Sequence, residues 1–409
     1  MKDELKNATF ESATLMDNLF CFSPLPSISL TKYLNNSKTL TRFSERQTDK
    51  LKGVFTVYEP FAPSSIVNTI HDQTMDQLQT STHNDNLCFS VYDREMAEGL
   101  DGAAPVKPDV IGTNRVILSG ERIRWTDSYQ MIPVEAKGNW LQLVAQAATY
   151  AQCIFTTGRR LFVLVIALQY ITREARFLFF HCSGLSSTTP AKLTTVEGWN
   201  RFIFAVVGIN ACPNALAAGL LGFSIPPDRS LCPIGQTLHA RHCIRGRATH
   251  VFSISLPNRT TLIVKESWPL RIRATEHEMF QQVSGRFGIP QIHKVEEVQG
   301  PDETPLDLRL YPADLKYWRL FKENLASNEE PEPEQWVFNW LILQDKAHSL
   351  KSARSPRELL LMQWLVRPHV NYLSSILLNC CAGYLNLYQA GWLHRDIRVS
   401  DGNIVILES

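Results

Sequence analysis

The chain has 409 residues, of which 44% are hydrophobic and 20% charged, so most of it should fold into two or three domains. Its formal net charge of +1 argues against a strongly electrostatic nucleic-acid or membrane partner, although a local basic site stays open. The 9 cysteines include no Cys-x-x-Cys pair and no compact Cys/His cluster, which argues against structural zinc and a disulfide framework.

The cysteines and the N-terminus bear on the cellular compartment of the protein. An odd number of cysteines in mostly apolar surroundings suits a reducing compartment, and Met1–Glu4 lacks a secretory signal pattern. The apolar run 202–225 has about the length of a membrane helix. Pro213 lies near its middle, so we favour two buried segments over a membrane span. We expect an intracellular protein, either cytoplasmic or nuclear, without a membrane partner.

The first half of the chain predicts a polar region followed by a mixed domain. Residues 1–85 are polar with short apolar clusters and predict loose helices, with a loop near 72–86. Residues 86–230 predict an α/β domain, because strand-like and helix-like patterns alternate there. The expected strands are 109–118, 130–136, 161–168 and 175–182, and the expected helices are 140–155 and 199–207.

Three charged residues lie at the ends of two of these expected strands. Asp109 begins one strand, and Glu135 and Lys137 end the next, two residues apart on one strand face. Two carboxylates could share a hard divalent cation, and the lysine could stabilise a phosphoryl charge. With the helix that follows, this pattern resembles the PD-(D/E)xK nuclease core. Two other interpretations stay open: surface charges at strand ends, or a nuclease-like fold without activity.

A second unit begins after a Pro- and Gly-bearing stretch, 226–238, which reads as an interdomain linker. Gly246, Thr249 and Val251 precede a strand, and Lys265 ends the returning strand. A glycine-bearing loop over the phosphates and a lysine on the third strand form the nucleotide site of protein kinases. Gly246 is the one glycine kept in this loop, and Thr249 is a partial substitute for another.

Lys265 needs a carboxylate partner, and the helix expected at 273–283 offers two. Met279, Phe280 and Val283 form its apolar face at i+3, i+4 and i+7 from Glu276, which places Glu276 on the inward side. Glu278 lies about 200° round the helix and should be solvated. We therefore expect Glu276 to pair with Lys265. A fifth strand is expected at 336–343 and further helices at 356–365 and 370–388.

A short polar loop near the C-terminus carries the sequence His394-Arg395-Asp396, then Asn403 and an apolar strand-like run at 404–407. An apolar helix-like run leads into it. This is the order of a protein-kinase catalytic loop, in which the Asp accepts or orients the substrate hydroxyl proton and the Asn helps to hold magnesium.

Together these residues resemble the fungal-type protein kinase family. The features that carry the resemblance are Lys265-Glu266-Ser267-Trp268, Arg273-x-x-Glu276, and Gly391–Ile397 before Gly402-Asn403-Ile404, with weaker features from about residue 85. The resemblance implies a bilobal kinase-like fold, ATP with Mg²⁺ as cofactors, and phosphoryl transfer to Ser or Thr of a protein substrate that the sequence does not identify. Gly246, Thr249, Val251, Lys265 and Glu276 would bind the nucleotide, Asn403 would bind the metal, and Asp396, Lys265, Arg395 and His394 would be catalytic.

Two departures from the family pattern bear on activity. Asn403 lies 403 − 396 = 7 positions after Asp396, where the usual pattern has about five. No Asp-Phe-Gly equivalent follows before Ser409. We therefore expect a C-terminally truncated kinase whose phosphoryl transfer is impaired, and the open alternatives are a pseudokinase that serves as a scaffold or binding protein, and a PD-(D/E)xK nuclease-like protein.

The expected fold class is α+β. The α/β domain at 86–230 would precede a kinase-like N-lobe at 240–345 and an incomplete C-lobe at 346–409. The sequence leaves open whether such a chain is an enzyme.

Overall fold

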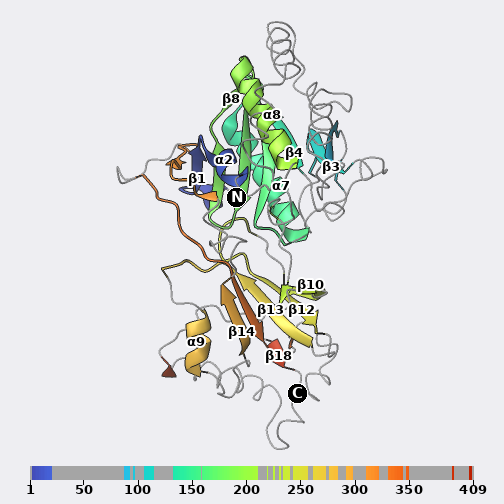
Figure 1. The fold of residues 1–409 in the computed structure, drawn as a ribbon, viewed down its shortest axis with the longest axis vertical. Coiled ribbons are helices and arrows are strands. Elements are labelled where there is room, and N and C mark those ends of the chain that lie inside the picture. Colours follow the sequence, from blue (N-terminus) through green and yellow to red (C-terminus); the bar gives the residue numbers. More distant parts are fainter. Residues whose placement is uncertain are drawn as a thin grey trace, which may run out of the picture. The chain divides into compact units, whose positions relative to one another are not determined.

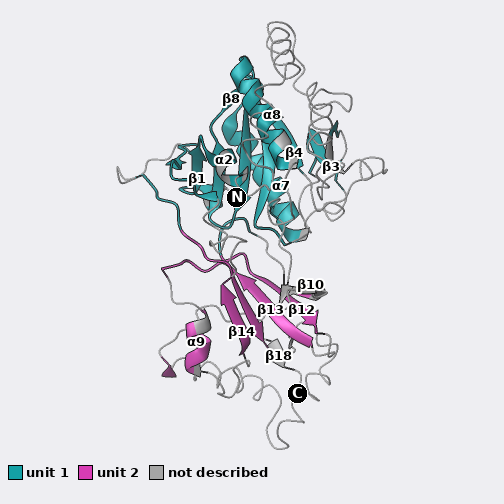
Figure 2. Ribbon diagram, viewed as in Figure 1, with its two compact units in different colours: residues 1–222, 242–246, 307–334 teal, residues 223–241, 247–306, 335–409 magenta. Residues whose placement is uncertain are grey.

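The computed structural model describes residues 2–20, 87–92, 95–96, 106–114, 132–157, 159–210, 219, 224–225, 230–231, 234–239, 243–256, 261–272, 276–283, 292–297, 310–321, 330–343, 347–349, 389–390 and 405–407. The chain divides into two compact units (Figure 2). The first comprises residues 1–222, 242–246 and 307–334, and the second comprises 223–241, 247–306 and 335–409. Each unit is built from segments that lie far apart in the sequence.

The first unit combines helices with a large mixed sheet (Figure 1). Its elements are α1 (Lys2–Leu5), β1 (Thr9–Ser12), α2 (Leu15–Phe20), β2 (Leu87–Val91), β3 (Val110–Asn114), β4 (Ile132–Lys137), α7 (Trp140–Thr157), β5 (Phe162–Gln169), β6 (Glu174–His181), β7 (Gly184–Thr188), β8 (Ala191–Lys192), α8 (Val196–Asn210) and β15 (Lys316–Tyr317).

In the described residues the strand order of this sheet is β15-β1-β7-β6-β5-β4-β3-β2, and β8 pairs with β6. The pairs β1–β7 and β4–β5 are parallel, and the other pairs are antiparallel. The parallel β4–β5 pair requires a crossover, which α7 supplies. β1 was not anticipated from the sequence, because a four-residue strand in a polar region gives no long periodic signal.

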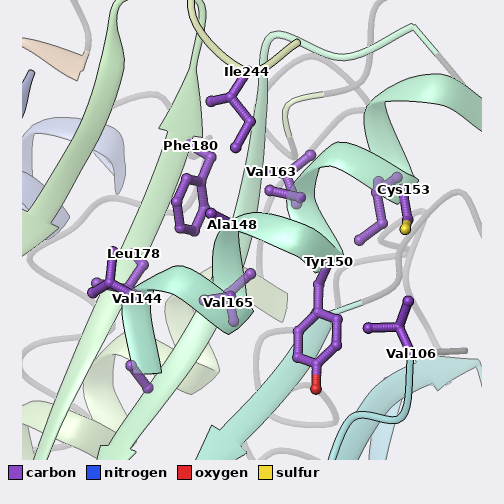
Figure 3. Close-up of a cluster of buried hydrophobic side chains, with 14 of the residues drawn as sticks. Val106, Val144, Ala148, Tyr150, Cys153, Val163, Val165, Leu178, Phe180 and Ile244 are labelled. Carbon is purple, nitrogen blue, oxygen red and sulfur yellow. The ribbon is translucent and has the colours of Figure 1, made fainter. Parts of the chain in front are cut away.

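Helices cover both faces of this sheet. Alternate residues of β5 and β6, among them Val163, Val165 and Phe180, pack with α7 in one buried apolar cluster (Figure 3). On the opposite face of β6, the ring of Phe177 lies 5.7 Å from that of Phe202 on α8. Because both faces are buried, the central strands are continuous apolar runs rather than alternating ones.

The second unit holds a five-stranded antiparallel sheet in its described part, with the order β11-β12-β13-β16-β14. Its elements are β9 (Ser224–Ile225), β10 (Ser230–Leu231), β11 (Ile234–His239), β12 (His250–Ser255), β13 (Thr261–Ser267), α9 (Glu276–Val283), β14 (Ile292–Glu297), β16 (Asn339–Leu343), β17 (Ala347–Ser349) and β18 (Val405–Leu407). The helix α9 lies between β13 and β14 in the chain and packs through Met279 and Phe280 against Leu341 and Val295.

These mixed sheets with few helices agree with the expected α+β class. The interpretation of 226–238 as a linker is wrong in part, because Ile234–His239 forms β11 and pairs with β12. The prolines and the glycine of this stretch lie before the strand or at its start, and they indicate a loop. The alternation of apolar and polar residues within the strand is too short to indicate a strand against them.

The helices expected at 356–365 and 370–388 and the break at Pro213 lie outside the described residues. Among the helices that the structure describes, none has the length and apolarity needed to span a membrane.

Candidate functional site

Lys265 lies on the inner strand β13 of the second unit, with a cross-strand neighbour on each side. Val251 on β12 and Leu341 on β16 are its register partners, so the three side chains share one face of the sheet. Leu341 on this face packs against Phe280 of α9. The strand register therefore directs Lys265 to the face that the helix covers.

The structure contains the ion pair that the sequence predicts for Lys265. Its Nζ donates to Glu276 Oε1 at 2.6 Å, and the two side chains are 27% and 29% exposed. Glu276 is the first residue of α9, and the apolar contacts of Met279 and Phe280 orient this helix. Glu278 is exposed, as its place on the helix predicts. A partly exposed lysine held by a carboxylate can present its charge to a phosphate.

The other residues expected at the nucleotide site differ in how they are placed. Val251 lies beside Lys265, and Thr249 is partly buried just before β12. Gly246 belongs to the first unit, where its N–H donates to the Cys182 carbonyl at 2.9 Å. Its φ of 125° is one that other residues rarely adopt. The structure thus brings Val251, Lys265 and Glu276 together. The Gly246 amide instead donates a hydrogen bond within the first unit.

The catalytic-loop residues His394, Arg395, Asp396 and Asn403 lie outside the described residues. The strand expected directly after Asn403 is present, since Val405–Leu407 forms β18 and pairs with β17 in antiparallel register.

A buried polar pair behind Lys265 was missed in the sequence. Glu266 points to the opposite face of β13, is 2% exposed, and accepts a hydrogen bond from Trp340 Nε1 at 2.9 Å. Nearby, the rings of Trp268 and Phe338 stack with centroids 4.6 Å apart. The Lys-Glu-Ser-Trp stretch therefore faces the helix with Lys265 and anchors the strand with Glu266 and Trp268.

In the first unit the structure brings Asp109, Glu135 and Lys137 together. Asp109 directly precedes β3, whose Val110 pairs with Val134 of β4, and its Oδ2 accepts the Ala136 N–H at 2.9 Å. Lys137 forms an ion pair with Glu135 Oε1. Glu135 is fully buried, whereas the Lys137 side chain is 34% exposed. Two carboxylates and one lysine thus meet at neighbouring strand ends.

The environment of this cluster shifts the pKa values of its members. Burial raises the pKa of Glu135, and Asp109 adds to that rise, against the opposing effects of Lys137 and Tyr150. Burial would lower the pKa of Lys137, but Glu135 and Asp109 outweigh it, so the net shift is upward. Carboxylate oxygens are the ligands that a hard cation prefers, but Lys137 and Tyr150 already engage both oxygens of Glu135.

Two residues of α7 complete the surroundings of Glu135 and were not singled out in the sequence. The Tyr150 hydroxyl donates to Glu135 Oε2 at 2.6 Å, and Gln146 Nε2 donates to the Tyr150 oxygen at 2.8 Å. The i, i+4 spacing of Gln146 and Tyr150, on the helix that directly follows Lys137, is the signal that could have found them. No cluster of three or more His, Cys, Asp and Glu side chains suited to a metal occurs in the described parts of the chain, so other oxygens would have to complete a cation's shell.

Comparison with known proteins bears on the Lys265 site in the second unit. No curated protein and no solved structure matches the chain significantly. The model of the family described as fungal protein kinase matches residues 227–409, which include Lys265, Glu276 and the His-Arg-Asp loop. The match does not extend to the Asp109 cluster. It confirms, for residues 227–409, the resemblance to the fungal protein kinase family that the sequence motifs predict.

Proposed function

We propose that residues 227–409 bind ATP with Mg²⁺ and act in phosphoryl transfer to Ser or Thr of a protein. The observation that carries this proposal is the Lys265–Glu276 ion pair, which lies on an inner strand of the five-stranded sheet within the region matched by the family. A strand lysine held by a helix glutamate is the pair that positions the nucleotide phosphates in protein kinases. The strand order, with α9 between β13 and β14, supports a kinase-like N-lobe.

In this proposal each residue has a defined task. ATP supplies the phosphoryl group, and Lys265 offers its ammonium to the phosphates while Glu276 fixes its direction. Val251, on the same face as Lys265, offers apolar contact to the nucleotide. Asp396 orients the substrate hydroxyl and takes its proton, Asn403 holds Mg²⁺, and His394 and Arg395 support this loop. Thr249 and Gly246 would cover the phosphates, as the glycine-bearing loop does in protein kinases.

Nucleotide binding is tested by calorimetry with Mg²⁺·ATP on the 409-residue chain. We expect Lys265→Met to weaken binding at least about 10-fold and Glu276→Gln to weaken it less, because the ammonium itself contacts phosphate. The matched controls are Lys294→Met, which breaks the Lys294–Glu296 pair at 2.8 Å, and Glu278→Gln on the exposed side of α9. Equal affinities of Lys265→Met and Lys294→Met would contradict the proposal.

Transfer is tested separately, since a pseudokinase can also bind nucleotide. We expect weak ATP turnover, because Asn403 lies seven positions after Asp396, where the usual pattern has five. Turnover at normal kinase rates that is lost on Asp396→Asn would overturn that expectation. Nucleotide binding without any turnover favours the scaffold or binding alternative.

A second candidate function is metal-dependent cleavage of phosphodiesters by the first unit, with Asp109, Glu135 and Lys137 as its site. Its support is the convergence of these residues at the ends of β3 and β4, followed by α7 and the parallel strand β5. This order agrees with the resemblance to the PD-(D/E)xK core. In such a site the carboxylates would bind the cation, and Lys137 would stabilise the phosphoryl charge.

Cleavage of linear DNA in the presence of Mg²⁺ or Mn²⁺ tests this candidate. Activity that disappears in Lys137→Ala but persists in Lys192→Ala, an exposed lysine of the same unit, supports it. Absence of metal-dependent cleavage together with absence of metal binding at Asp109 and Glu135 leaves the cluster as charged residues at strand ends.

A further inference from the structure

The face of β13 that points away from Lys265 carries a buried row of side chains across three strands. Glu266 is the register partner of Trp340 on β16 and of His250 on β12, so the three side chains share this face. All three are buried. A buried carboxylate is costly unless a donor pairs with it, and the Trp340 Nε1–H donates to Glu266 Oε1 at 2.9 Å. The row therefore lies directly behind the strand that presents the lysine.

Aromatic rings hold the donor of this bond in place. The ring centroid of Trp340 lies 6.1 Å from that of Phe338 in an edge contact, and Phe338 stacks on Trp268 with centroids 4.6 Å apart. Trp268 lies two residues after Glu266 and Phe338 two residues before Trp340, so the alternation of side chains puts both pairs on one face. One hydrogen bond and one stacked ring pair, side by side, thus fix the register of β13 against β16.

Lys265 depends on this register for its direction. Its ion pair with Glu276 is partly exposed, and pairs of this kind contribute little to the place of a strand. A shift of β13 by one residue would turn Lys265 to the opposite face of the sheet. The same shift would break the bond of Glu266 to Trp340 and turn the carboxylate toward the apolar side chains that pack with α9. A buried carboxylate without its donor is costly, so the bond opposes the shift.

We propose that Glu266 and Trp340 are the positioning residues of Lys265, and that their bond sets the affinity of the second unit for Mg²⁺·ATP. The inference rests on the proposed function of residues 227–409. A buried charged group often adds less stability than a well-packed apolar one, but here its need for the indole donor selects one register. Misplacement of a functional group by about 1 Å can cost about 100-fold in function. Loss of the bond therefore acts on phosphate binding through Lys265.

The experiment is calorimetry with Mg²⁺·ATP on the 409-residue chain, with thermal unfolding to show that each variant is folded. We expect Trp340→Phe to weaken binding about 10-fold or more, because it removes the donor and keeps a ring. Glu266→Ala should weaken binding more than Glu266→Gln, which keeps an acceptor oxygen. The matched control is Trp336→Phe, since Trp336 is a buried indole of the same unit whose Nε1 has no hydrogen-bond partner among the described residues. This variant should bind Mg²⁺·ATP as the unaltered chain does.

A double-mutant cycle with Lys265→Met separates positioning from a general loss of packing. In a Lys265→Met background, Trp340→Phe should not change the residual affinity further, and an undiminished effect there contradicts the inference. If Trp340→Phe binds Mg²⁺·ATP as tightly as Trp336→Phe does, the positioning role is wrong and the proposed function stands. If the unaltered chain does not bind Mg²⁺·ATP, or if Lys265→Met binds it equally well, both are wrong.

A second variant decides the test if Trp340→Phe does not fold. Glu266→Met combined with Trp340→Phe removes both partners and leaves neither the carboxylate nor the indole buried without its partner, so its stability should change little. We expect this double variant to bind Mg²⁺·ATP about 10-fold more weakly all the same. Unaltered affinity in the folded double variant overturns the inference.

Discussion

Glu266 and Trp340 are cross-strand partners on β13 and β16, and the indole Nε1–H donates to Glu266 Oε1 at 2.9 Å. Glu266 is 2% exposed and Trp340 is 6% exposed, so the bond is shielded from water. Lys265 precedes Glu266 and faces the other side of the sheet. The buried bond therefore secures the strand that presents the lysine.

The first prediction concerns this bond. Glu266→Ala removes the acceptor of a buried indole N–H, and we expect it to lower the free energy of unfolding by about 1–3 kcal/mol. Glu266→Gln keeps an acceptor oxygen and should lose less. Urea unfolding of the three chains, monitored by tryptophan fluorescence, measures the difference. If the alanine variant is as stable as the glutamine variant, the bond does not stabilise β13.

The Lys265–Glu276 pair should contribute little to stability. Both side chains are more than a quarter exposed, and pairs of this kind typically contribute about 0–1 kcal/mol. We therefore expect Glu276→Gln without nucleotide to unfold at nearly the same urea concentration as Glu296→Gln, which breaks the comparable Lys294–Glu296 pair. A large loss confined to Glu276→Gln would mean that the ion pair is structural rather than reserved for a ligand.

The central elements could be predicted because their signals are long. The apolar run that became β5 and the helical spacing within α7 each cover a whole element. The short strands β1 and β15 could not be predicted in this way. β1 pairs with β7 and, across some 300 residues of sequence, with β15, and no local pattern encodes that pairing.

The same difference between local and long-range signals decides which residues around Lys265 could be predicted. The partner of Lys265 could be inferred because the apolar face of a single helix, carrying Met279 and Phe280, selects Glu276 over Glu278. The role of Glu266 could not, because a charged residue in a strand gives no sign that the indole of Trp340, which lies 74 residues later on the neighbouring strand β16, will meet it. Gly246 was assigned by its motif, but its amide is bonded to Cys182 by tertiary packing.

Another prediction concerns Arg176, which contacts two indole rings. Its guanidinium carbon is 5.2 Å from the ring centroid of Trp140 and 4.2 Å from that of Trp318, and Nη1 donates to Glu11 at 2.5 Å and to the Thr188 carbonyl at 2.9 Å. These contacts join β6 to β1, to α7 and to the segment after β15. A lysine lacks the planar group that stacks and donates at once.

We therefore expect Arg176→Lys to lower the free energy of unfolding by about 2 kcal/mol, because a part-buried ion pair and two cation–π contacts are weakened together. Arg201→Lys, at an exposed position of α8, is the control and should change little. Chemical unfolding followed by circular dichroism compares the two. Equal stability of both variants would show that the stacked guanidinium does not hold these segments.

The last prediction concerns the carboxylate of Asp314. It accepts four hydrogen bonds from the residues that directly precede α2. Ser12 Oγ and Thr14 Oγ1 donate to Oδ1 at 2.5 and 2.6 Å, and the N–H groups of Ala13 and Thr14 donate to Oδ2 at 2.9 and 3.3 Å. Desolvation alone would raise the pKa of Asp314, but these bonds outweigh it and hold the pKa below its ordinary value of 3.8.

A carboxyl group whose pKa is lower in the folded than in the unfolded chain stabilises the fold above the unfolded value and loses that contribution as the pH falls through the folded value. We therefore expect Asp314→Asn to be less stable than the unaltered chain near pH 7, and the difference to shrink as the pH falls below about 3.8. Unfolding temperatures measured across this range test the prediction, with Glu332→Gln at an exposed position as the control. A difference that does not change with pH would mean that Asp314 holds α2 through the geometry of its bonds and not through its charge.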